Sequence, residues 1–139
     1  MTKTFAASHA WIRRGEKYLF LHRASSTRYR PGFWDIPGGT VEPGESPEEA
    51  LTREISEETK IDIEIGKPLF IYNNLTQFPD RQTFQIVFEC LYLGGSVSLH
   101  DSEHQGYDWL TPLEARGLKL IEFTQSFLDR DYPTTLLSN

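Results

Sequence analysis

The sequence has a single cysteine and no long apolar run. Cys90 therefore cannot form an intramolecular disulfide, and its position in the apolar run Phe88–Leu91 predicts a buried strand thiol in a reducing cytoplasm. No segment reaches the roughly 20 apolar residues of a membrane-spanning helix. The residues before Arg13 also lack the apolar block of a signal peptide. We therefore expect a soluble, cytoplasmic protein.

Basic residues are in the minority. The chain has 14 Lys and Arg against 20 Asp and Glu, a net charge of −6. This sign argues against a protein that holds a nucleic-acid polymer by broad electrostatics, and it suits a metal site. With 139 residues, of which 38% are hydrophobic and 13% aromatic, the composition predicts a single folded domain over residues 1–139.

Apolar runs and turn signals predict an α/β arrangement. Expected strands lie at residues 5–13, 17–23, 61–74, 82–93 and 107–110. Residues 24–33 are predicted to form a surface loop. Its residues Arg28 and Arg30 are expected either to be solvated or to attract a polyphosphate substrate. Ser46, Pro47 and Glu49 form a capping-box signature for a helix over residues 47–59. A helical turn at 112–115 and a helix at 118–129 complete a layered α/β domain.

The predicted central helix carries acids on its inward face. At about 100° per residue, Glu54, Glu57 and Glu58 fall on the same side as the apolar Leu51. The simplest alternative is a solvated acidic helix, because Glu favours helices. Glu54 and Glu58, however, are like charges four residues apart, which destabilises a helix, and a bound divalent cation would reverse that repulsion.

These residues also carry a family resemblance. Residues 39–61, GTVEPGESPEEALTREISEETKI, resemble the Nudix box, whose pattern is Gly, five residues, Glu, seven residues, then Arg-Glu-apolar-any-Glu-Glu-any-Gly-apolar. Every fixed position matches except Lys60, which stands where the family has Gly. The preceding segment Trp34–Gly39 also resembles the family's approach to the box. The resemblance implies a Nudix-type α/β/α sandwich with a mixed β-sheet.

The resemblance also implies roles for individual residues. It implies metal ligands at Glu54, Glu57, Glu58 and the backbone carbonyl of Gly38, with Mg²⁺ or Mn²⁺ as the ion. It implies structural roles within the motif for Gly39, Glu45 and Arg53, the last two as an ion pair between loop and helix. Glu54, Glu57 and Glu103 are the candidate catalytic acids. Which of them is the general base, and how many metal ions bind, stay open.

Three further candidates lie outside the box. Glu103 precedes the aromatic segment that contains Trp109 and is similar to a loop Glu that serves the family as metal ligand or base; the alternative is a solvated loop acid. Arg23 ends a predicted strand, where it would bind phosphate or remain a surface charge. Trp34 would stack on the substrate or belong to the core. The neighbouring His104 requires no special role.

The resemblance implies metal-dependent hydrolysis of a phosphoanhydride bond in a small nucleotide-like substrate. Conversion of a nucleoside triphosphate to a monophosphate and pyrophosphate is favoured, because the chain is short and shows no extra domain. ADP-ribose, a sugar nucleotide or a dinucleotide is the alternative substrate, and a non-catalytic nucleotide sensor is the alternative class. The protein would be a monomer or a homodimer.

The departure at Lys60 carries its own expectation. Helices often end on a left-handed residue, where Gly has no Cβ penalty. If the same turn is kept, Lys60 has a left-handed backbone, is mildly strained, and is tolerated rather than required.

Overall fold

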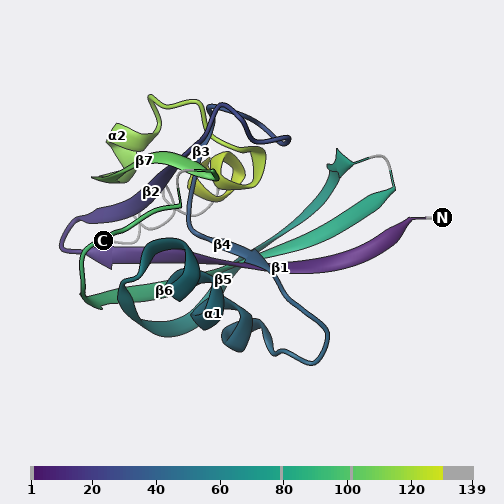
Figure 1. Ribbon diagram of the computed structural model, residues 1–139, viewed down its shortest axis with the longest axis horizontal. Coiled ribbons are helices and arrows are strands. Elements are labelled where there is room, and N and C mark those ends of the chain that lie inside the picture. Colours follow the sequence, from purple (N-terminus) through teal and green to yellow (C-terminus); the bar gives the residue numbers. More distant parts are fainter. Residues whose placement is uncertain (1, 79, 101, 130–139) are drawn as a thin grey trace.

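The computed structural model describes residues 2–78, 80–100 and 102–129, which form one mixed sheet with helices on both faces (Figure 1). The sheet contains, within these residues, the seven strands β1 (Lys3–Arg14), β2 (Lys17–Arg23), β3 (Trp34–Asp35), β4 (Gly38–Thr40), β5 (Asp62–Phe78), β6 (Arg81–Gly94) and β7 (His104–Leu110). The helices are α1 (Pro47–Thr59), α2 (Pro112–Ala115) and a helical segment at 122–129. No helix in this described part is long and apolar enough to cross a membrane.

Alternating side chains of β1 build the two cores. Ala10 and Ile12 pack in one cluster with Leu51 of α1, whereas Trp11 packs in the other with Phe127 of the helical segment 122–129. Successive residues of a strand point to opposite faces, so one strand supplies both layers. This arrangement confirms the expected α/β/α sandwich.

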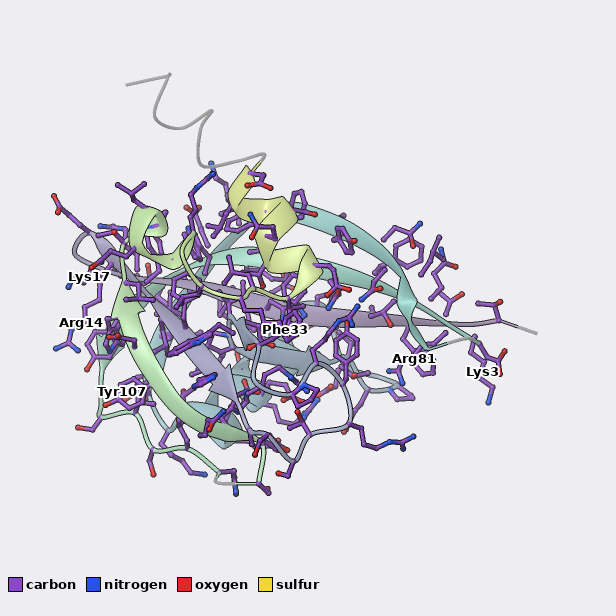
Figure 2. The ribbon with its side chains drawn as sticks, turned by 90° about the horizontal axis from the view of Figure 1, so that it is seen from above. Lys3, Arg14, Lys17, Phe33, Arg81 and Tyr107 are labelled. Carbon is purple, nitrogen blue, oxygen red and sulfur yellow. The ribbon has the colours of Figure 1, made fainter. Side chains whose placement is uncertain are left out.

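β1 lies in the middle of the sheet, whose order is β3-β2-β1-β6-β5, with β4 paired to β1 and β7 to β2. β1 and β6 are parallel, from Lys3 opposite Arg81 to Arg13 opposite Leu91, and the other pairs are antiparallel. Figure 2 shows Lys3 and Arg81 at one end of the molecule and Arg14 at the other. The sheet is therefore mixed, as expected.

α1 begins and ends at the predicted residues. The Ser46 hydroxyl accepts from the Glu49 N–H at 3.1 Å, and Glu49 Oε1 accepts from the Ser46 N–H at 2.9 Å. Two otherwise unpaired donors of the first turn are thereby satisfied, as a capping box requires. Because these signals are local in the sequence, the start of α1 could be predicted from it.

Lys60 ends α1 in the left-handed conformation, with φ 65° and ψ 13°, and its N–H donates to the Ser56 carbonyl. The expected geometry is therefore present. A side chain in this region carries a penalty of about 1 kcal/mol that Gly avoids.

We expect Lys60→Gly to raise the free energy of unfolding by roughly 0.5–1 kcal/mol, less the greater freedom that Gly gives the unfolded chain. Denaturant unfolding in EDTA measures this without metal binding. Lys60→Ala is the matched control, because it removes the charge and keeps the Cβ, so it should not reproduce the gain. A gain of equal size in Lys60→Ala would assign the effect to the charge.

Three predicted boundaries are wrong. The strand expected to end at residue 74 continues to Phe78, and amide side chains bridge this hairpin: Asn74 donates to Gln85 at 3.2 Å and Gln82 to Asn73 at 2.9 Å. The strand expected at 107–110 starts at residue 104. The helix expected at 118–129 is helical only from 122, because Leu120 instead forms a bridge with Trp34.

Candidate active site

The acids of α1 and the loop before β7 meet at one cavity. It has a volume of about 270 Å³ and is lined by Glu54, Glu57, Glu58, His100 and Glu103. The Glu58 side chain is only 11% exposed, whereas that of Glu57 is 60% exposed. The three helix acids therefore face the same space at different depths, and the expectation that all three point inward is too simple for Glu57, which lies at the rim.

Glu58 is the deepest of these acids. Its Oε1 accepts a hydrogen bond from the Gly38 N–H at 2.9 Å, which ties the end of α1 to β4. Burial raises its pKa well above the usual value, and the charge of the nearby Asp35 adds to this. A buried carboxyl that faces further carboxyls favours either a proton or a cation beside it.

Glu54 lies against Gly39. A Cβ added at Gly39 would come within 2.4 Å of Glu54 Cδ, so the absence of a side chain there makes room for the carboxylate. Burial raises the pKa of Glu54, and the hydrogen bond from Arg53 Nη1, at 2.9 Å, opposes that shift.

Arg53 joins the loop before α1 to the helix. Its Nε and Nη2 donate to the two carboxylate oxygens of Glu45, at 2.8 and 2.9 Å, and Nη2 also donates to the Thr40 carbonyl. This hydrogen bonding lowers the pKa of Glu45 to about 2. The bidentate contact fixes the position from which Glu54 and Glu57 extend.

His104 joins the acids, although sequence reasoning gave it little weight. Its Nε2 lies 4.0 Å from Glu58 Oε2, and ligand atoms of Glu58, Glu103 and His104 all lie within 4.8 Å of one another. Burial lowers the pKa of His104 to about 4, with a smaller contribution from Arg23. β7 begins at His104, opposite Arg23. The predicted strand began only at residue 107, so His104 was assigned to the loop and its place beside Glu58 was missed.

A second cavity, of about 160 Å³, adjoins the first because Glu58 lines both. Its wall includes Arg23, Asp35, Gln85 and Phe123. Arg23 is held in place there, since its Nε donates to the Tyr29 carbonyl at 2.9 Å and its Nη1 lies 3.6 Å from Asp35. Burial raises the pKa of Asp35 to about 7, against the effect of Arg23.

Comparison with known proteins identifies the family to which this site belongs. A family model described as the NUDIX domain matches residues 3–130. The chain belongs to the Nudix family of pyrophosphohydrolases. It is 34% identical over 123 residues to the nucleoside triphosphatase NudI of Enterobacter sp. (strain 638), covering 82% of this chain and 86% of NudI.

Two further proteins are similar to this chain, one in sequence and one in structure. A MutT-like protein of Streptomyces ambofaciens is 36% identical over 74% of the chain, which spans 60% of that protein's length. The crystal structure of a MutT protein from Methanosarcina mazei Go1 superimposes with a TM-score of 0.82 and 30% identity, covering 93% of both chains. The Nudix fold thus extends over nearly the whole chain.

Of the two roles expected for Trp34, stacking on the substrate and packing in the core, its position in this Nudix chain supports packing. Trp34 lines neither of the two cavities but stacks on His22, with ring centroids 4.4 Å apart. Arg30, expected to be solvated, instead donates from Nε to Glu122 at 3.1 Å. Both residues contribute to packing around the segment before β3. A larger cavity, of about 430 Å³, is lined by Trp11 and Lys67 among others and contains none of the glutamates that line the acid cavity.

The donors at the acid cavity fit a hard divalent cation. Mg²⁺ and Mn²⁺ prefer oxygen ligands, and the cavity offers four carboxylates, of which Glu58 is buried next to other acids. Glu58, Glu103 and His104 form a group that could bind a metal. Gly38 lines the adjoining second cavity, and its N–H donates to Glu58, which lines both cavities.

Proposed function

We propose that this Nudix hydrolase converts nucleoside triphosphates to nucleoside monophosphates and pyrophosphate and that it requires Mg²⁺ or Mn²⁺. The observation that carries the proposal is the position of Glu58, which lines both cavities. The acid cavity would hold the phosphates and their cation, and the second cavity would hold the nucleoside beside Phe123 and Gln85. The name of the relative NudI, a nucleoside triphosphatase, supports this substrate class.

Four acids and one arginine divide the work in this proposal. Glu54, Glu57, Glu58 and the Gly38 carbonyl would hold the cation, and Glu103 would serve as a further ligand or as the base. The bound cation would supply positive charge beside the phosphates. Arg23, oriented by Tyr29 and Asp35, would bind a phosphoryl oxygen.

The hydrolytic step follows from these positions. A water oxygen forms a bond to phosphorus while the bond from that phosphorus to the pyrophosphate oxygen breaks. One of the cavity glutamates accepts the proton of the water. Glu103 suits this task because it lies on a loop and not on α1, so its carboxylate approaches the cavity from another side.

A panel of substrates tests the proposal. Nucleoside triphosphates, ADP-ribose, a sugar nucleotide and a dinucleotide are incubated with the protein and Mg²⁺, and products are separated by ion exchange. Monophosphate and pyrophosphate from a triphosphate, abolished by EDTA and restored by Mg²⁺, is the expected result. Preferential cleavage of ADP-ribose or a sugar nucleotide would assign the alternative substrate class. Nucleotide binding without any product would assign a sensor.

We expect Glu103→Gln to lower kcat far more than it changes KM, by about 10² or more, because a base acts on the chemical step. Steady-state kinetics on the best substrate of the panel measures both parameters. Glu16→Gln, in the exposed turn between β1 and β2 and outside both cavities, is the control. A change confined to KM would make Glu103 a binding residue and move the base to α1.

A further inference from the structure

β5 forms an open edge of the sheet. In the described part of the chain it pairs only with β6 and stands last in the strand order. Figure 1 shows β5 and β6 extending together with β1 past α1. In such a strand alternate N–H and C=O groups point away from the sheet and are available to another strand.

This edge lacks two of the features that usually block pairing, and its register with β6 is regular from Phe70 to Asn74, with shifts on either side. Residues 69–78 contain no charged residue and no proline, although the whole chain has a net charge of −6. Charged side chains and proline are the common means by which edge strands avoid other chains. The last charged residue and proline before this stretch are Lys67 and Pro68.

The same stretch exposes apolar side chains on one face. Ile71 and Leu75 are each 61% exposed. They lie four residues apart, so both point to the same face of the strand. Phe84 of β6, opposite Asn73 in the register, is 36% exposed. Unpaired backbone groups and exposed apolar side chains therefore occur together.

We propose that β5 pairs antiparallel with β5 of a second copy of this chain, about a two-fold axis at Asn73. In this register Ile71 lies opposite the partner's Leu75, and Leu75 opposite the partner's Ile71, so the exposed apolar side chains contact one another across the new strand pair. The neutral edge lets two copies with like net charge approach without repulsion across the new strand pair. Two-fold pairing makes the contact isologous and closed.

The pairing leaves the active site open. Neither Ile71 nor Leu75 lines the acid cavity or the adjoining one. The dimer would thus contain one sheet that runs through both copies, with two independent sites.

Sedimentation velocity over a range of protein concentrations tests the association. The mass is expected to rise from 16.0 kDa toward twice that value. Ile71→Lys and Leu75→Lys place charges on the edge and should each raise the dissociation constant at least about tenfold. The matched control is Leu113→Lys, at an exposed position (73%) in α2, which should leave it unchanged. A wild-type mass that never exceeds one copy, association past two copies, or equal effects of all three variants would overturn the proposal.

Cysteine cross-linking tests the register. Antiparallel partners directly opposite one another have Cα atoms about 4.5–5.5 Å apart, within disulfide range. Asn73→Cys should therefore form a covalent dimer on mild oxidation. Leu75→Cys should not, because its two copies would be about 13 Å apart. The native Cys90 is buried and does not compete. Cross-linking of Leu75→Cys but not of Asn73→Cys would refute the axis at Asn73.

Discussion

Replacing Glu57 by Gln is expected to lower kcat for nucleotide hydrolysis by a factor of at least about 10², while the free energy of unfolding changes by less than about 0.5 kcal/mol. The Glu57 side chain is 60% exposed, and its ion pair with Arg53 spans 3.5 Å. An exposed pair of this kind contributes little to stability. The carboxylate nevertheless faces the acid cavity, where its charge acts on the reaction.

Glu48→Gln is the matched control for this prediction. Glu48 is an exposed acid of the same helix that lines neither of the two cavities. Its replacement should leave kcat within about threefold of the wild-type value. Comparable losses in both variants would mean that the net charge of α1 matters and not the position of Glu57. Full activity of Glu57→Gln would remove it from the metal site.

The second large effect is expected for Gly38→Ala, which should lower the free energy of unfolding by at least about 3 kcal/mol. A Cβ at residue 38 would lie 2.1 Å from the Ser8 carbonyl oxygen and 2.7 Å from His9 Cα. Both atoms belong to the backbone of β1, so they cannot move aside as a flexible side chain can. The residue also has φ +150°, which Ala rarely adopts. Chemical denaturation in EDTA measures the loss.

Gly44→Ala separates backbone strain from steric overlap. Gly44 has φ +89°, but no atom lies within 4 Å of the position its Cβ would take. Only the conformational penalty remains, so the loss should be about 1 kcal/mol. If both variants lost the same stability, the close approach of β4 to β1 would not be the cause.

The extent to which the fold could be predicted depends on how local its signals are. Ser46, Pro47 and Glu49 are neighbours in sequence, and α1 starts where they indicate. The continuation of β5 from residue 75 to Phe78 could not be predicted, because it depends on pairing with β6 across the hairpin. Likewise Leu118 to Ile121 have apolar character suited to a helix, but pairing with Trp34 decides their conformation.

The candidate site divides in the same way. Helical periodicity alone brought Glu54, Glu57 and Glu58 to one side, and the structure adds Glu103 to the same cavity. The periodicity could not show that Glu57 is exposed at the rim. The second cavity was also beyond prediction, since its wall combines residues of β1, β2, β6 and the segment before the last helix. Tertiary contacts also decide that Trp34 stacks on His22.

The parallel pairing of β1 with β6 constrains the order in which the chain can fold. Lys3 lies opposite Arg81 and Arg13 opposite Leu91, so the central contact of the sheet joins segments separated by most of the sequence. Closing so long a loop costs conformational entropy before the hydrogen bonds between the two strands form. The β1–β6 pair is therefore expected to form more slowly than α1 or the β5–β6 hairpin. During synthesis on the ribosome, β1 emerges before β6 and must wait for it. Until then its apolar residues Ala10, Trp11 and Ile12 lack their sheet partner and are open to chaperones or to misassociation.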